Sequence, residues 1–326
     1  MTEYLDRPSV TLEVNHREAT GYFGPWVLDL TYVDHMAGES DGLEIRLDNS
    51  DGRWMREWYP VKGTSIQATI GYEGGKFLST GICQVDEIEL SGPPDTVTIK
   101  ALAAGNTRAL RTPKSRAFEG KSLNAIAAEV AGIHGLSMVG EVPEISWRRS
   151  TQNRETDLGF LCRLGEEHGI VFSVKGDLLV FHELQKLEAG PKVLKLGPSD
   201  LTSYRFREKV VAGAASASYF DGSTKELVVA EFQLNESRHP DKKKIHRRTE
   251  NKGQTRRLAN MAMRTQKAFE RDGTLALPGN TLLLAGGIFE LESFGALDGL
   301  WMIRSARHSV SSSGYTTEME ARHVSN

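Results

Sequence analysis

The chain has 326 residues and a mass of 36.0 kDa, with 39% hydrophobic residues, 25% charged residues and a formal net charge of −3. This length predicts two or three domains, and this composition excludes an intrinsically disordered chain. No run of about 18 apolar residues occurs in the sequence, so we expect no membrane-spanning helix.

The first hundred residues are rich in short segments in which apolar side chains alternate with polar ones. Such alternation is typical of strands that are buried on one face. Turn-forming residues at 48–52 and 73–75 separate neighbouring segments. The pattern predicts an antiparallel barrel or sandwich of at least five strands. These strands are expected at 10–14, 43–47, 66–72, 81–90 and 96–102.

The period of the apolar residues changes near residue 121, where two helices are predicted. Ser122 is a suitable N-cap for a helix with an apolar stripe over 123–131. Thr156 is a suitable cap for a second helix at 157–168, and Gly169 follows its end.

The second helix has a clear apolar side. We expect Leu158, Leu161 and Leu164 to face the core of this unit, and Asp157 and Arg163 to face solvent. A core of this kind makes the two helices part of a small α+β unit.

Strand patterns continue to the C-terminus, with one further helix expected at 255–270. The further strands are expected at 170–174, 178–181, 201–206, 214–219, 226–232, 282–294, 300–310 and 315–322. We therefore predict a mainly β fold with an α+β insertion. The predicted units are a first antiparallel β-barrel domain at 1–112, a small α+β domain at 113–190 and a second antiparallel β-barrel domain at 191–326.

Motifs for catalysis, cofactor binding and metal binding are not found in the sequence. It has no His-Glu-x-x-His, no Gly-x-Ser-x-Gly, no phosphate-binding loop and no dinucleotide fingerprint. Cys83 and Cys162 are too few for a disulfide framework or a cysteine-rich zinc site. Glu87 and Glu89 share one face of a strand, which we interpret as a solvated edge rather than a catalytic pair. We predict no catalytic residue, no cofactor and no metal.

Charge is unevenly distributed along the chain. Residues 1–100 hold 17 Asp and Glu against 8 Lys and Arg, whereas residues 239–257 hold 8 Lys and Arg against 2 Asp and Glu. The basic stretch is interpreted as a solvated loop, a nucleic-acid contact, or an interface arm that meets an acidic partner such as the first domain of a neighbouring subunit. The candidate interface residues are Lys242, Lys243, Lys244, Arg247 and Arg248.

Three stretches together resemble a known family. They are KSLNAIA at 121–127, QNRETDLGFLCRL at 152–164, and the C-terminal set of LPGN at 277–280, LDGLWMI at 297–303 and GYTTEME at 314–320. Together they resemble the phage late control gene D protein family, the baseplate hub of contractile tails. The middle stretch is also similar to the N-terminal hub part of VgrG, the spike protein of type VI secretion.

The resemblance implies a structural protein and not an enzyme. Three copies would form a ring, and the two β-barrels of each copy would imitate the sixfold symmetry of a tail tube. The resemblance implies a homotrimer of this chain. Its implied partners are a central spike protein, tail tube and baseplate wedge proteins, and a tape-measure protein. No membrane partner is implied, and nucleic acid is expected only in passage. The chain ends soon after the last motif, so we expect a separate spike protein and no appended lysozyme-like segment.

The implied location is the tail baseplate of a phage particle or tailocin. The first ten residues lack the order of a signal peptide, so assembly is expected in the host bacterial cytoplasm. In a ring, the acidic first hundred residues are expected to give the lumen a negative potential, with the basic stretch away from it. Two alternatives stay open: a tail-associated peptidoglycan hydrolase and a nucleic-acid-binding module.

Overall fold

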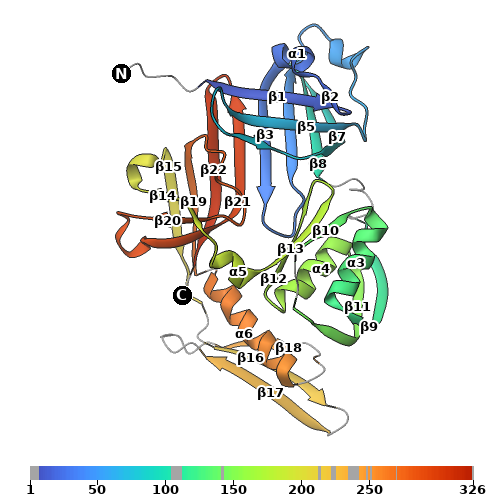
Figure 1. Ribbon diagram of the computed structural model, residues 1–326, viewed down its shortest axis with the longest axis vertical. Coiled ribbons are helices and arrows are strands. Elements are labelled where there is room, and N and C mark those ends of the chain that lie inside the picture. Colours follow the sequence, from blue (N-terminus) through green and yellow to red (C-terminus); the bar gives the residue numbers. More distant parts are fainter. Residues whose placement is uncertain are drawn as a thin grey trace.

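The computed structural model describes residues 7–103, 112–140, 143–211, 214–221, 225–233, 242–246, 249, 252–268 and 270–324. Strands dominate these residues, and the longer helices lie in one unit in the middle of the chain and in one segment near its C-terminal third (Figure 1). The fold is mainly β with an α+β insertion, which confirms the predicted fold class. None of the helices in the described ranges is both long and apolar enough to cross a membrane.

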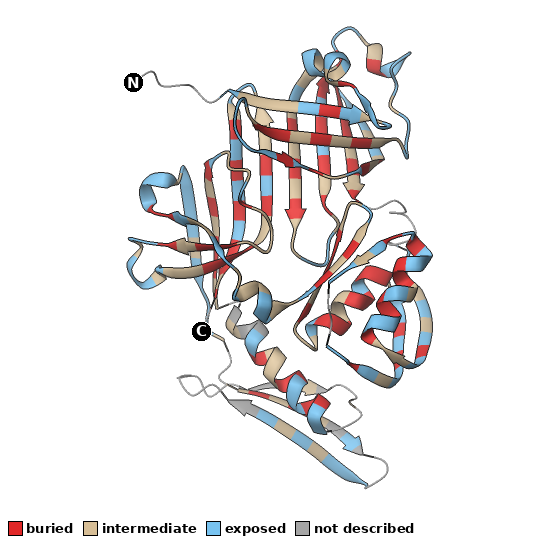
Figure 2. Cartoon of the chain, viewed as in Figure 1, coloured by how far each residue is buried: buried red, intermediate tan, exposed pale blue. Residues whose placement is uncertain are grey.

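The first β-domain surrounds an apolar core. Alternation along the strands places Leu30, Ile45 and Ile99 on one inner face, where each is at most 1% exposed. β1 and β5 cross over β3, β4 and β8, and the core lies between these two layers (Figures 1 and 2). The elements are β1 (Pro8–Val14), β2 (Arg17–Glu18), α1 (Thr20–Phe23), η1 (Gly24–Trp26), β3 (Val27–His35), β4 (Gly42–Asp48), η2 (Arg53–Met55), β5 (Ser65–Tyr72), β6 (Phe77–Ser79), β7 (Cys83–Ser91) and β8 (Thr96–Ala103).

The second β-domain has its own core around Phe289 and Trp301, which are fully buried. Its strands alternate in the same way, so Leu275 and Met319 lie side by side in that core. The elements are β14 (Lys192–Leu196), η3 (Pro198–Asp200), β15 (Ser203–Glu208), β19 (Arg271–Pro278), β20 (Ile288–Leu291), η4 (Gly295–Leu297), β21 (Gly299–Ser311) and β22 (Gly314–His323).

The two β-domains share one sheet because β21 pairs antiparallel with β3. The sheet has 14 strands, and its main path reads β15-β19-β22-β21-β3-β4-β8-β7 before it turns into β5, β1 and β2. His308 lies opposite Tyr32 at the joint, and both side chains are buried. The two β-domains are therefore joined by backbone hydrogen bonds as well as by side-chain packing.

The small α+β domain packs two helices on a three-stranded sheet and a two-stranded ribbon. Both helices begin at the predicted caps: the Ser122 hydroxyl accepts from Ala125 N at 3.2 Å, and the Thr156 hydroxyl accepts from Gly159 N at 3.0 Å. The elements are β9 (Lys114–Ser122), α3 (Leu123–His134), β10 (Ser137–Val139), β11 (Ser146–Glu155), α4 (Asp157–Glu166), β12 (Ile170–Lys175), β13 (Leu178–Glu183) and α5 (Leu184–Glu188).

A separate three-stranded sheet and one helix form what we call the arm, at the bottom of Figure 1. Ala217 and Ile245 pack against Leu258 and Ala259 of the helix, which explains the apolar stripe of this amphipathic segment. The elements are β16 (Ala214–Asp221), β17 (Glu226–Gln233), β18 (Lys242–His246) and α6 (Lys252–Ala268).

Several elements differ from the sequence-based expectation. The strands β3, β9, β11, β14, β18 and β19 and the short strands β2, β6 and β10 lie where none is predicted. Of these, β9 and β11 form a charged ribbon without clear apolar alternation. The strand expected at 282–294 is only Ile288–Leu291, because the chain turns before it and Gly286 has a φ of +85°. The division at 112 and 190 stays a prediction, and within 191–326 the arm is a sheet distinct from that of the second β-domain.

Candidate functional site

The main sheet has one apolar face and one polar face over the eight strands from β15 to β7. Because side chains alternate, the register that places Leu30, Ile45 and Ile99 in the core places Asp29, Glu44 and Lys100 on the opposite side. We call this opposite side the polar face. Its members, in strand order, are Arg205, Arg207, Asp272, Thr274, Glu318, Glu320, Ser305, Arg307, Ser309, Asp29, Thr31, Glu44, Arg46, Thr98, Lys100, Glu87 and Glu89.

Charges on the polar face meet their opposites across neighbouring strands. Arg207 Nε lies 3.0 Å from Asp272 Oδ1, and Arg46 Nε lies 2.5 Å from Asp29 Oδ2. At the far end, Lys100 Nζ donates to Glu87 Oε1 at 2.8 Å. The polar face carries charges of both signs, with an excess of acidic side chains, and the predicted negative lumen stays a prediction that only a ring can test.

Beneath the polar face, the core side of the joint contains a buried histidine. His308 Nε2 donates to the Leu283 carbonyl at 3.1 Å, so Nδ1 accepts from the Tyr315 hydroxyl at 2.8 Å. Burial lowers the pKa of His308 to about 4 and raises the pKa of Tyr315 to about 12. At neutral pH both groups are uncharged and fixed, which suits a structural role.

Three units of the molecule meet at Asp34, which is buried in β3. Lys175 Nζ of the small domain donates to Asp34 and, at 2.8 Å, to Asp41 Oδ1. Ala285 N of the second β-domain donates to Asp34 Oδ2 at 2.7 Å. Burial raises the pKa of Asp41 and Lys175 opposes that effect. Lys175 therefore fixes the small domain to the first β-domain, and Asp34 also connects the first β-domain to the second through Ala285.

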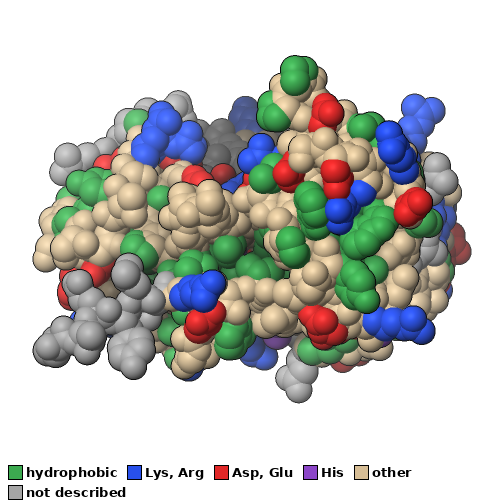
Figure 3. Space-filling view, turned by 90° about the horizontal axis from the view of Figure 1, so that it is seen from above, with side chains coloured by type: hydrophobic (Ala, Val, Ile, Leu, Met, Phe, Trp, Pro, Cys, Tyr) green, Lys and Arg blue, Asp and Glu red, His purple; other side chains and the backbone are tan. Residues whose placement is uncertain are grey.

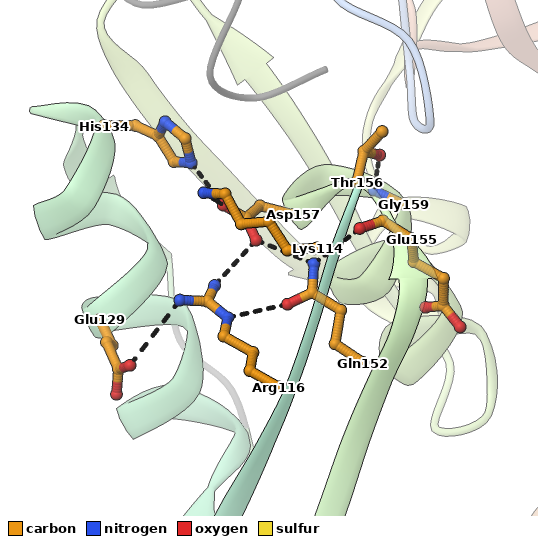
Figure 4. A network of polar contacts seen from close by, with 9 residues as sticks. All are labelled: Lys114, Arg116, Glu129, His134, Gln152, Glu155, Thr156, Asp157 and Gly159. Carbon is orange, nitrogen blue, oxygen red and sulfur yellow. Dashed lines mark hydrogen bonds and ion pairs between the residues drawn. The ribbon is translucent and has the colours of Figure 1, made fainter. Parts of the chain in front are cut away.

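Another buried carboxylate, Asp157, lies inside the small domain (Figure 4). Its Oδ2 accepts from Lys114 Nζ at 2.5 Å and contacts His134 Nε2 at 2.7 Å. Its Oδ1 accepts from Arg116 Nη2 at 2.8 Å and from Gln152 Nε2 at 2.9 Å. The ribbon β9–β11 and the helices α3 and α4 are thereby held together at one point.

This position corrects the expectation that Asp157 faces solvent. Burial alone would raise the pKa of Asp157, but the hydrogen bonds from Lys114, Gln152 and His134 outweigh it and hold the pKa below its ordinary value. The helical period predicted an exposed Asp157, because a pattern within one helix says nothing about Lys114 and Arg116, which β9 brings to this carboxylate. Arg163 lies at the margin of the domain and donates from Nε to Glu155 at 3.0 Å.

A cleft of about 840 Å³ lies where the polar face meets the small domain and α6. Arg307 and Glu318 line it from the polar face, and Phe172, Cys162 and Met261 line it from the other side. The Cys162 thiol donates to the Phe172 carbonyl at 3.6 Å, and burial raises its pKa to about 12. The cysteine is therefore a thiol at neutral pH.

One end of the first β-domain exposes an aromatic surface formed by α1 and the segment 53–61. Tyr22 is 64% exposed, Tyr59 49% and Val61 68%. The Trp58 ring is tilted against the Tyr22 ring with 6.1 Å between their centroids, and the Arg53 guanidinium lies 3.7 Å from the centroid of the Trp26 ring. Figure 3, which views the molecule from this end, shows hydrophobic side chains gathered among charged ones. Exposed Tyr, Trp and Arg of this kind are typical of protein interfaces.

The predicted interface residues lie partly in the arm. Lys242, Lys243 and Lys244 belong to β18, which pairs in parallel with β16, and the Lys244 side chain is exposed. Arg247 and Arg248 lie outside the described residues. The role of these five residues stays a prediction.

Within the described ranges, no group of three or more His, Cys, Asp or Glu side chains is arranged to hold a metal ion. The features missed by sequence reasoning are the polar face and the buried carboxylates Asp34, Asp41 and Asp157. In the sequence, only the alternation of apolar and polar residues indicated the polar face. The pair Glu87 and Glu89, which lies on its last strand, was the one part of it that the sequence analysis singled out.

Comparison with known proteins identifies a family. The model of the phage tail baseplate hub (GPD) family matches residues 95–314, more than half of the chain. A curated protein of Escherichia phage 186, described as a probable baseplate hub protein, is 30% identical over 176 residues. That match covers 53% of this chain and 44% of the relative. The chain thus spans less than half the length of this relative.

Solved structures show the same fold. A 43 kDa tail protein of prophage MuSo2 from Shewanella oneidensis has a TM-score of 0.75 at 14% identity, covering 97% of this chain and 98% of that chain. An Escherichia coli protein described as a component of the type VI secretion system has a TM-score of 0.59 at 13% identity, covering 98% of this chain and 77% of that chain. The likeness to proteins of both systems agrees with the resemblance seen in the sequence.

Proposed function

Because the chain belongs to the phage tail baseplate hub (GPD) family, we propose that it is a structural hub subunit of which three copies form a ring. The ring would join the tail tube to a central spike protein in the baseplate. Its contacts would include wedge and tape-measure proteins, and it would assemble in the host bacterial cytoplasm.

The observation that carries this proposal is the strand path of the main sheet. Four strands come from the second β-domain, β15-β19-β22-β21, and four from the first, β3-β4-β8-β7. Each chain therefore contributes two four-stranded groups side by side. Three copies would place six such groups around an axis, which is the arrangement needed to continue a sixfold tube.

The polar face suits the inside of such a tube. Several of its opposite charges are paired across strands, and its acidic side chains outnumber its basic ones, so the surface is hydrated and would not attract a passing polyanion. Nothing in the described residues favours the peptidoglycan hydrolase or the nucleic-acid module over this structural role. We propose that the polar face lines the channel.

Mass measurement tests the ring. The protein is co-expressed with the spike protein of the same tail, and the complex is examined by multi-angle light scattering and native mass spectrometry. We expect three copies of this chain per complex, with the spike protein alone as the control. Complexes that never contain more than one copy would contradict the proposal.

The arm provides a second test of the same ring. We propose that its lysines meet an acidic surface of a neighbouring subunit, since the first hundred residues hold an excess of acidic residues. Lys244→Glu is then expected to reduce the three-copy complex in the same measurement. Undiminished assembly of this variant would restrict the arm to other partners.

A further inference from the structure

The eight-strand path of the main sheet ends in two edges that carry no strand on their outer side within the described residues. At one end, β15 pairs only with β19. At the other end, β7 pairs with β8 along its length, but with β5 only at Gln84 and Cys83. Residues 87–91 of β7 and Ser203–Glu208 of β15 thus present open backbone edges. Figure 1 shows these two strands toward opposite sides of the sheet. Open edges of this length are sites for pairing with another chain.

The directions of the strands allow the two edges to pair with each other in different copies. Every neighbouring pair from β15 to β7 is antiparallel. With eight strands in alternation, the first and last run in opposite directions. A β7 placed beside the β15 of another copy therefore continues the antiparallel order without a break.

The charges at the two edges are complementary on the polar face. Glu87 and Glu89 end the face at β7, and their side chains are 56% and 55% exposed. Arg205 and Arg207 end the same face at β15, and the Arg207 side chain is 56% exposed. Cross-strand pairs of opposite charge stabilise a sheet, whereas like charges destabilise it. Two β7 edges or two β15 edges would bring like charges together, so the edges favour a head-to-tail contact.

The apolar face is complementary at the same two edges. Leu90 of β7 is 45% exposed and Tyr204 of β15 is 53% exposed, although both point to the core side. Ile88 and Phe206 lie next to them and are partly buried against their own cores. Pairing the edges would cover the exposed apolar side chains and extend the core across the joint.

The chain already contains a joint of this kind. Where β21 meets β3, Ser309 and Thr31 share a hydrogen bond of 3.1 Å on the polar face, and His308 lies opposite Tyr32 on the core side. A contact between β7 and β15 would repeat this arrangement between copies. Both joints would then connect a first β-domain to a second β-domain.

From these observations we infer that residues 87–91 of β7 pair antiparallel with Ser203–Glu208 of β15 in the next copy of the chain, with Glu87 and Glu89 facing Arg205 and Arg207. The inference rests on the proposed function, since it names the contact that closes the ring. Repetition of one head-to-tail contact closes into a ring when the rotation allows it. The result is a continuous sheet around the channel.

Charge exchange tests the contact. Glu89→Lys and Arg205→Glu are each co-expressed with the spike protein of the same tail, and complexes are counted by native mass spectrometry. Each single variant is expected to lower the fraction of three-copy complexes by about tenfold or more. The combined variant Glu89→Lys with Arg205→Glu restores opposite charges at every contact, and we expect it to recover assembly. The matched controls are Glu144→Lys and Arg154→Glu, which are exposed in the small domain.

Disulfide cross-linking provides an independent measurement. Oxidation of the variant Leu90→Cys with Tyr204→Cys is expected to give covalent species of two and three chains on a denaturing gel. Each single variant, and the pair Leu90→Cys with Phe220→Cys, is expected to stay largely uncrosslinked. The native thiols are a limited background, because Cys83 is buried and Cys162 is half-buried.

The outcomes separate this contact from the proposed function. If the wild-type chain forms rings and both charge variants assemble equally well, the β7–β15 contact is wrong and the hub function stands. Rings that form without any cross-link between positions 90 and 204 lead to the same conclusion. If the wild-type chain never exceeds one copy per complex, the ring and the contact both fail.

Discussion

In the small α+β domain the Asp157 carboxylate is fully buried and meets Lys114 and Arg116, whereas on the polar face the Asp29 carboxylate meets Arg46 beside solvent. The groups are chemically the same, but their surroundings differ. In the interior each donor must be present, because a charge left alone there is costly. At the surface water replaces a lost partner, so the polar face can change partners or acquire new ones. The buried contacts of Asp157 therefore stabilise the small domain, whereas the exposed charges of the polar face remain accessible for binding.

The largest expected effect concerns the core beneath the buried network. Leu161 is fully buried in α4, so Leu161→Asp places an unpaired charge among apolar side chains. We expect a loss of about 5 kcal/mol in the free energy of unfolding of the small domain. Hydrogen exchange of the α4 amides measures it, with Leu161→Met as the volume-conserving control. Unchanged protection in the aspartate variant would show that the helix does not pack as described.

The next effect concerns the network itself. Asp157→Ala leaves Lys114, Arg116 and His134 without their shared acceptor, and we expect a loss of about 4 kcal/mol. Urea unfolding of the full chain gives the value. Glu119→Ala, which removes an exposed partner of Arg149 in the same domain, is the control and should change little. Equal effects of the two substitutions would remove the distinction between buried and exposed charge.

Acid should affect the joint beneath the polar face. The pKa of His308 is lowered to about 4 by burial, whereas an unfolded histidine titrates near 6.5. The unfolded state therefore binds the proton first, and stability falls as pH is lowered from 6.5 to 4. His308 alone is expected to account for a loss of about 3 kcal/mol in the free energy of unfolding over this pH range. His308→Gln, measured by urea unfolding at pH 7 and pH 4.5, should reduce the pH dependence, and His16→Gln at an exposed position should not.

The smallest effect is expected on the polar face. Asp29→Ala breaks the contact with Arg46, but the Arg46 side chain is 51% exposed and is rehydrated. We expect a loss of about 0.5 kcal/mol in the free energy of unfolding. Thermal unfolding beside the wild-type chain measures it. A loss as large as that of Asp157→Ala would mean that the polar face is a structural core and not an open surface.

Local signals in the sequence predicted the helices well. Ser122 and Thr156 cap α3 and α4 as expected, because a cap requires only a hydroxyl three residues before a free N–H. The hairpin of β12 and β13 was found for a similar reason, since its turn lies within a few residues. Charged strands such as β9 and β11 were missed because their stability depends on each other and on the helices above them.

The sequence by itself therefore determined the mainly β fold, the position of the α+β insertion and the family resemblance, since alternation, caps and motifs are local properties. Only the tertiary structure decided that Ser309 lies beside Thr31, residues that are 278 positions apart. It also decided that Asp157 and Asp34 are buried rather than solvated, because the donors that make their burial tolerable come from distant segments. Register and burial depend on which strands meet, and this pairing is fixed by packing across the whole chain.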